Sequence, residues 1–155
     1  MTLEQEIGQL LNQRGQTVCT AESCTGGLIA SRITDIAGSS AYMLGGVVAY
    51  SNEVKQQLLN VQEETLITYG AVSEPTAREM ALGARALFGA DYALSVTGIA
   101  GPGGGTDEKP VGLTYIGLAG PAGLVIVERH IWQGDRIANK QSSATAALQL
   151  LLKTL

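Results

Sequence analysis

The sequence predicts an α/β fold, specifically a three-layer α/β/α domain with a mixed β-sheet. Segments with helical spacing of apolar residues alternate with short apolar, β-branched runs, as in layered α/β proteins. Near the C-terminus, two apolar runs flank the turn Gly120-Pro121-Ala122-Gly123, which predicts an antiparallel hairpin. The chain has 155 residues and no linker, repeat or low-complexity tail, so we expect residues 1–155 to form one domain.

The elements expected in the N-terminal half follow from apolar periodicity and turn residues. Helical spacing of Leu3, Ile7 and Leu11 predicts a helix that ends at Gly15. In order, we then expect a strand at Thr17–Thr20, a helix at Gly26–Thr34, a loop of small residues at Ile36–Ser40, a buried strand at Val47–Tyr50, a short helix from Ser51 toward Leu59 and a helical turn at Gln62–Tyr69.

The C-terminal half is expected to contain a helix, a strand, the hairpin and a final helix. Ser73 followed by Glu74-Pro75 is a favourable helix start, and Gly89 ends that helix. We then expect a strand at Tyr92–Thr97, a glycine-rich loop at Gly98–Gly105, hairpin strands at Val111–Leu118 and Leu124–Trp132, and a long helix from Arg136.

Composition excludes several classes of protein. The net charge is −4, from 10 basic and 14 acidic residues, which gives no electrostatic footprint for nucleic acid. No run approaches the roughly 20 apolar residues of a membrane helix. Cys19 and Cys24 are poorly placed for a disulfide, and two cysteines with one histidine make no zinc site. We therefore expect a cytoplasmic protein with reduced thiols, and no metal, nucleic-acid or membrane partner.

The segment Thr20-Ala21-Glu22-Ser23-Cys24-Thr25-Gly26-Gly27 is the first candidate for a functional site. It joins a strand to a helix, where backbone N–H groups and the helix dipole can hold an anion or an oxyanion. Ser23 and Cys24 are candidate nucleophiles, and Thr25 and Gly26 are candidate N–H donors. The alternative is structural: Ser23 caps the helix, and the glycines allow close packing of helix and sheet.

A histidine base for these nucleophiles would have to be His130, the only histidine in the chain. His130 lies inside a strand pattern, which favours a structural role for its side chain. A free cysteine such as Cys24 is commonly a small buried apolar residue. Serine chemistry at Ser23 therefore requires a different base.

Tyr50-Ser51-Asn52-Glu53-Val54-Lys55 is the second candidate segment, at the end of a strand and the start of a helix. Lys55 could serve as a general base if burial lowered its pKa. Tyr50 is a candidate for orienting a ligand ring or hydroxyl. The alternatives are a solvated lysine on the helix surface and a half-buried aromatic residue at the strand end.

Two further segments offer groups for binding an anion. Gly101, Gly103 and Thr106 belong to a glycine-rich loop that lacks P-loop or dinucleotide-binding spacing but has many free N–H groups. Arg136 and Lys140 share one face of a helix start and could grip a phosphate together. A flexible loop and a solvated basic helix start are the structural alternatives.

Five motifs occur in a distinctive order: AESCTGG, ITDIAGSSAY followed by YSNEVK, GAVSEPTAREMA, SVTGIAGPGGGTDEKPVG and QGDR. Together they resemble the C-terminal domain of the CinA family, also called the competence-damage-inducible A family. The resemblance extends from about Gly8 to Leu155. Fused members of this family carry an additional molybdopterin-binding-like domain. The sequence contains no segment that resembles this domain, so we expect the stand-alone form.

The resemblance implies hydrolysis of nicotinamide mononucleotide to nicotinate mononucleotide and ammonia by a serine/lysine amidohydrolase without a cofactor or metal. Carried over by motif, Ser23 is the implied nucleophile, Lys55 the general base and Tyr50 the neighbouring aromatic residue. The phosphate and ribose then need anchors, for which the loop Gly101–Thr106 and the pair Arg136 and Lys140 are candidates. The resemblance also implies the three-layer fold, a small-molecule nucleotide substrate and a homo-oligomer.

One position departs from the family pattern. Family members commonly carry an arginine where this chain has Lys140, and lysine keeps the charge but loses the planar guanidinium fork. A weakened phosphate site would suit a second hypothesis, a non-catalytic nucleotide-binding protein associated with competence or DNA damage. A cysteine hydrolase that uses Cys24 is a third hypothesis.

Overall fold

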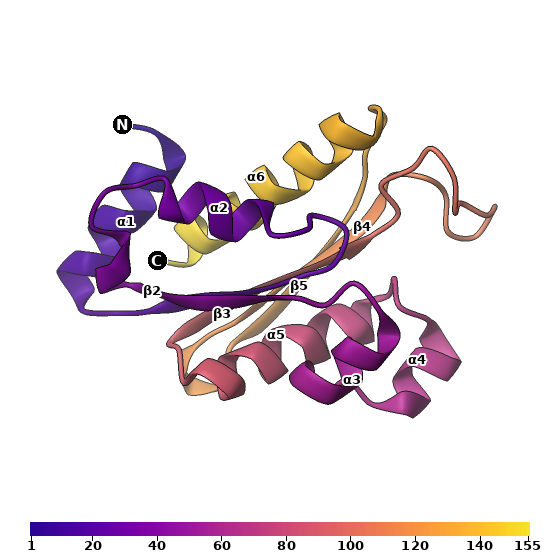
Figure 1. Cartoon of the computed structure of the whole chain (residues 1–155), viewed down its shortest axis with the longest axis horizontal. Coiled ribbons are helices and arrows are strands. Elements are labelled where there is room, and N and C mark those ends of the chain that lie inside the picture. The colour runs from indigo at the N-terminus through magenta and orange to yellow at the C-terminus, as the bar shows by residue number, and fades with distance from the viewer.

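The computed structural model describes all 155 residues, which form a five-stranded sheet with helices on both faces (Figure 1). The strand order is β2-β1-β3-β4-β5, where β1 is Val18–Glu22, β2 is Met43–Val48, β3 is Tyr92–Gly98, β4 is Leu113–Ala119 and β5 is Val125–Ile131. β1 pairs in parallel with β2 and β3, whereas β4 pairs antiparallel with β3 and β5. The sheet is therefore mixed, as predicted.

The helices form one layer on each face of the sheet (Figure 1). One layer contains α1 (Leu3–Arg14), α2 (Leu28–Thr34) and α6 (Arg136–Thr154), and the other contains α3 (Asn52–Leu59), α4 (Glu63–Tyr69) and α5 (Glu74–Phe88). The predicted three-layer α/β/α architecture is confirmed. None of these helices combines the length and apolar character that crossing a membrane requires.

The two faces of the sheet carry side chains of different size, because successive strand residues point to opposite faces. Large residues such as Leu94 and Ile116 pack under α1, α2 and α6. Small residues such as Ala93 and Ala119 face the alanines of α5 on the other side. The small face lets α5 approach closely, since a Cβ at Gly117 would lie 2.8 Å from the carbonyl oxygen of Ala77.

The edge strand β2 differs from the prediction. The run Val47–Tyr50 suggested a buried strand, but β2 begins at Met43 and pairs only with β1. Its alternate side chains face solvent, with Leu44 45% and Val48 50% exposed. Gly45 and Gly46 interrupt the apolar pattern, which is why the sequence placed this strand too late in the chain.

Most other elements agree with the predictions to within a few residues. Helix α5 has Ser73 as its N-cap and Gly89 as its C-cap, and α6 begins at Arg136 after Asp135. Helix α2 begins later than predicted, at Leu28, because Gly26 and Gly27 have φ angles of 62° and 100°. Such positive angles do not fit a right-handed helix.

The strand order creates a binding position at the carboxyl end of β1. From β1 the chain crosses through α2 to β2, and from β2 it crosses through α3, α4 and α5 to β3 on the opposite side of β1. The two crossovers leave in opposite directions, so a crevice opens beyond the carboxyl end of β1. Ser23 follows β1 at this point.

Gly83 marks a close approach between α3 and α5, and replacing it should lower the stability of the fold. A Cβ at position 83 would lie 1.7 Å from the carbonyl oxygen of Leu59. Alanine normally stabilises a helix by about 1 kcal/mol relative to glycine, but here the two backbones must separate. We expect Gly83→Ala to lower the free energy of unfolding by about 2–3 kcal/mol, measured by urea unfolding.

A matched control lies on the exposed side of the same helix. Arg78 is about half exposed and pairs with Glu74 at 3.1 Å. Arg78→Ala should change the free energy of unfolding by less than about 1 kcal/mol. Equal losses in the two variants would contradict the close-packing explanation.

Candidate active site

Ser23 is fixed by the sheet at the carboxyl end of β1. Its main-chain N–H donates to the carbonyl oxygen of Val96 on β3 at 2.9 Å, which continues the pairing of β1 with β3 beyond Glu22. The Ser23 side chain is only 9% exposed and lines a cavity of about 300 Å³. The cavity is also lined by Tyr50 and Lys55, by Thr97 and by residues of the glycine-rich loop.

Lys55 is buried, with 2% of its surface exposed. Ser51 caps the start of α3 and so fixes the turn that carries Lys55. The Lys55 Nζ lies 3.1 Å from the Ser23 Oγ and donates to the carbonyl oxygens of Ala49 at 2.9 Å and Tyr50 at 3.5 Å. No carboxylate forms an ion pair with it. The alternative of a solvated lysine is therefore wrong.

Burial lowers the pKa of Lys55, because the surrounding protein disfavours the charged ammonium form. A neutral lysine amine has two N–H donors and one lone pair. In this neutral form the N–H groups can stay on the carbonyl oxygens of Ala49 and Tyr50, and the lone pair is then free to accept the proton of the Ser23 hydroxyl, 3.1 Å away. This geometry suits proton transfer from Ser23 to Lys55.

The turn after Ser23 contains main-chain N–H groups that are not paired within the protein. The N–H groups of Cys24 and Thr25 have no acceptor within the protein, whereas the N–H of Gly26 donates to the carbonyl oxygen of Ser23 at 3.1 Å. Of the two predicted donors, Thr25 is thus available and Gly26 is already occupied. An oxyanion formed next to Ser23 could accept hydrogen bonds from Cys24 and Thr25.

Glu22 holds this turn in place, a role that the sequence did not reveal. Its carboxylate is 1% exposed and accepts hydrogen bonds from the Thr25 Oγ1 at 2.7 Å and from the main-chain N–H groups of Ile29 at 2.8 Å and Ala30 at 3.0 Å. Glu22 therefore accepts N–H groups of the first turn of α2 that have no partner within the helix. The alternative in which Ser23 caps the helix is wrong, because the N-cap of α2 is Gly27. The Ser23 hydroxyl forms its hydrogen bond with Lys55 instead.

Cys24 and His130 do not form a second catalytic pair. Burial raises the pKa of the Cys24 thiol to about 11, so little reactive thiolate exists at neutral pH. His130 lies on β5, stacks on Trp132 with ring centroids 4.6 Å apart and faces Glu128 at 3.4 Å. His130 is not among the residues that line the cavity.

The glycine-rich loop after β3 forms one wall of the cavity. Gly101 and Gly103 line the cavity, and their role in binding stays a prediction. Thr106 does not, because its N–H and hydroxyl both bond the main chain of Lys109 in a turn of their own. Thr97, which the sequence did not single out, also lines the cavity, and its hydroxyl donates to the carbonyl oxygen of Ala71 at 2.6 Å.

Arg136 and Lys140 bring positive charge to the site, and neither forms an ion pair. Arg136 donates to the carbonyl oxygen of Gly101 at 2.8 Å and to the hydroxyl of Tyr50 at 3.2 Å. The Tyr50 side chain is 64% exposed, so it borders the cavity rather than being half-buried. The Lys140 Nζ lies beside Gly26, 3.6 Å from where a Cβ would stand.

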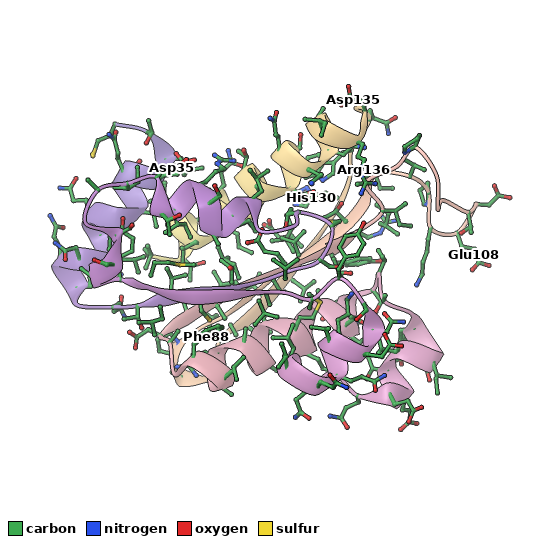
Figure 2. All side chains as sticks on the ribbon, viewed as in Figure 1. Asp35, Phe88, Glu108, His130, Asp135 and Arg136 are labelled. Carbon is green, nitrogen blue, oxygen red and sulfur yellow. The ribbon has the colours of Figure 1, made fainter.

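The basic start of α6 thus lies next to the glycine-rich loop, through Arg136, and next to the turn after Ser23, through Lys140. Figure 2 shows Asp135 and Arg136 at this end of α6, on the side of the molecule from which the loop carrying Glu108 extends. Asp135 caps the helix by accepting the N–H of Ala138 at 2.8 Å. The cavity therefore brings together six of the predicted residues: Ser23, Tyr50, Lys55, Gly101, Gly103 and Arg136. Thr25 and Gly26 lie in the turn after Ser23 without lining the cavity, Lys140 lies beside Gly26, and Thr106 is outside the cavity.

Comparisons with known proteins agree with this fold. The family model of the CinA C-terminal domain matches residues 1–155. A putative competence-damage inducible protein of Halothermothrix orenii is 56% identical over 154 residues, which cover 99% of this chain and 37% of that protein. The nicotinamide-nucleotide amidohydrolase PncC of Escherichia coli K12 is 53% identical over 151 residues, which cover 97% of this chain and 92% of that protein.

Solved structures share the same architecture over nearly the whole chain. The competence/damage inducible protein CihA from Agrobacterium tumefaciens is 44% identical with a TM-score of 0.96, covering 97% of this chain and 92% of that chain. The competence damage-inducible protein A from Klebsiella pneumoniae is 38% identical with a TM-score of 0.94, covering 97% and 93%. With the family model matched from the first residue to the last, the chain belongs to the CinA C-terminal domain family.

Proposed function

We propose that the chain hydrolyses the carboxamide of nicotinamide mononucleotide to nicotinate mononucleotide and ammonia. The observation that carries this proposal is the 3.1 Å hydrogen bond between the Ser23 Oγ and the buried Nζ of Lys55. The similarity to the nicotinamide-nucleotide amidohydrolase of Escherichia coli supplies the substrate class. The chain spans only 37% of the Halothermothrix orenii relative, so the proposal concerns the residues of this chain and not the rest of that longer protein.

In the first half of the reaction, Lys55 takes the hydroxyl proton while the Ser23 oxygen attacks the carboxamide carbon. The main-chain N–H groups of Cys24 and Thr25 donate to the resulting oxyanion. Lys55 then returns the proton to the amide nitrogen, the C–N bond breaks, and ammonia leaves. The nicotinoyl group remains as an ester on Ser23.

In the second half, water attacks the ester carbon while Lys55 accepts a proton from that water. The oxyanion forms again at the same N–H groups. When the C–O bond to Ser23 breaks, Lys55 returns the proton to the serine oxygen. Nicotinate mononucleotide is released and the starting state of both side chains is restored.

The rest of the substrate is held by the cations and the loop. Arg136 and Lys140 carry unpaired positive charge for the phosphate, and no carboxylate lines the cavity to repel it. The N–H groups of Gly101 and Gly103 are further donors at the cavity wall. Tyr50, partly exposed beside Arg136, offers a ring for the nicotinamide.

Ser23→Ala should abolish ammonia release from nicotinamide mononucleotide, because the variant lacks the nucleophile. We expect a loss of at least about a thousandfold in kcat, measured by ammonia release from purified protein. Cys24→Ala should keep activity within about tenfold, since the buried thiol takes no part in the chemistry.

The same assay separates the competing hypotheses. An unchanged rate in Ser23→Ala would exclude the serine mechanism, and a rate abolished only in Cys24→Ala would favour a cysteine hydrolase. Calorimetric binding of the nucleotide by the wild-type protein without any turnover would instead support the non-catalytic nucleotide-binding protein.

The activity should depend on the protonation of Lys55. Only the neutral amine can accept the Ser23 proton, so kcat/KM should fall as the pH falls through the lowered pKa of Lys55 and level off above it. Lys55→Arg should be inactive at every pH, because arginine stays protonated in proteins. A Lys55→Arg variant with a wild-type pH profile would contradict the role of Lys55 as the base.

Lys55 should also make the stability of the protein depend on pH. Its folded-state pKa lies below the unfolded value of 10.5, so the folded protein binds fewer protons than the unfolded chain between the two values. The contribution of Lys55 to stability is therefore complete only above the unfolded pKa and is lost as the pH falls toward the folded pKa. Lys55→Met removes this titration.

Urea unfolding of the wild-type protein and Lys55→Met between about pH 7 and pH 10 tests this expectation. The free energy of unfolding of Lys55→Met minus that of wild type should decrease as the pH rises, with a slope of at most about 1.4 kcal/mol per pH unit. The carbonyls that lose their donor add a cost that does not depend on pH. A difference that stays constant over this range would contradict the lowered pKa.

A further inference from the structure

We propose that Asn139 is a positioning residue that turns the N–H group of Gly101 toward the bound nucleotide. This inference rests on the proposed function, because it concerns the binding of the same substrate. Asn139 lies on the first turns of α6 and is only 2% exposed. A buried side-chain amide is retained where its donor and acceptor both find partners.

The Asn139 amide uses both of its ends. Its Nδ2 donates to the carbonyl oxygen of Ala100 at 3.0 Å, and its Oδ1 accepts the main-chain N–H of Gly134 at 3.0 Å. One side chain thus connects the glycine-rich loop, the turn before α6 and α6 itself. On the same helix, Arg136 donates to the next carbonyl oxygen of the loop, that of Gly101, at 2.8 Å.

A fixed carbonyl sets the direction of the N–H group that shares its peptide. In a trans peptide, the C=O and the following N–H point in opposite directions. The only cis peptide in the chain is Gly101-Pro102, so the peptide from Ala100 to Gly101 is trans. With the Ala100 carbonyl held against α6, the Gly101 N–H points away from α6. It has no acceptor in the protein, and Gly101 lines the cavity that contains Ser23 and Lys55.

An N–H group held in this way is a ready donor for an oxygen of the ribosyl phosphate part of the substrate. Because the loop has few side chains of its own, its conformation depends on the partners of its carbonyl groups. Asn139 contacts neither Ser23 nor Lys55, so its contribution is the same before and during the chemical step. Loss of Asn139 should therefore raise KM with little effect on kcat.

Ser143 provides a matched control one turn further along α6. It is 1% exposed, and its hydroxyl donates to the carbonyl oxygen of Asn139 at 2.8 Å and accepts the Nε1–H of Trp132 at 2.9 Å. Ser143 is therefore as buried and as hydrogen-bonded as Asn139, but it does not contact the loop. Asn139→Leu and Ser143→Ala each remove buried hydrogen bonds from the same helix.

The experiment compares these two variants in steady-state ammonia release and in binding. Asn139→Leu should raise KM for nicotinamide mononucleotide about tenfold and leave kcat within about threefold. In the inactive Ser23→Ala background, the same change should weaken calorimetric binding of nicotinamide mononucleotide about tenfold. Ser143→Ala should lower Tm but leave KM within about twofold.

An unchanged KM in Asn139→Leu, a loss of kcat alone, or an equal rise of KM in Ser143→Ala would overturn the proposal. If Asn139→Leu does not fold, Asn139→Ala serves instead, since it removes both hydrogen bonds of the side chain without adding bulk or charge. It should show the same rise of KM. An unchanged KM there would overturn the proposal as well.

The binding measurement tests the role of Asn139 independently of whether the protein hydrolyses the nucleotide. A wild-type protein that binds nicotinamide mononucleotide and releases no ammonia would contradict the function, while the comparison of Ser23→Ala with and without Asn139→Leu would still decide the role of Asn139. A wild-type protein that does not bind the nucleotide would contradict both.

Discussion

The contact between the buried amine of Lys55 and the Ser23 hydroxyl is the constraint on which the rest of the site depends. An amine removed from water without a carboxylate partner is unfavourable for folding, and the surrounding packing must offset that cost. The backbone provides what holds it: β3 fixes Ser23, the capped start of α3 fixes Lys55, and two carbonyl oxygens orient the Nζ. The removal of the charged amine from water is the source of its lowered pKa.

The arrangement also requires that the neighbouring carboxylate stay away from Lys55. Glu22 precedes Ser23 in the chain, and an ion pair with it would raise the pKa of Lys55 rather than lower it. The start of α2 prevents this, because two of its main-chain N–H groups and the Thr25 hydroxyl hold the Glu22 carboxylate. Helix α2 therefore acts on Lys55 indirectly, by binding the carboxylate that adjoins Ser23 in the chain.

The sequence predicted the elements whose signals are local and could not predict the contacts between them. Helix α5 and the β4–β5 hairpin carry their own caps, turns and periodicity, so their positions were predictable. β2 was misplaced because its glycines hide the strand pattern. The burial of Lys55 depends on which face of α3 meets the sheet, and the occupied N–H of Gly26 depends on the turn it closes, so neither could be read from residue spacing.

The residues proposed for the chemistry and the cations proposed for the phosphate lie in different layers of the fold. Ser23 follows the carboxyl end of β1 and Lys55 lies on α3 on one face of the sheet, whereas Arg136, Asn139 and Lys140 lie on α6 on the other face. The net charge of −4 does not count against an anionic ligand at this cavity, because Arg136 lines it, Lys140 lies beside Gly26 and no carboxylate lines it. Since the glycine-rich loop is held through its carbonyl groups by α6, we expect substitutions on α6 to change affinity and substitutions at Ser23 and Lys55 to change the proposed reaction itself.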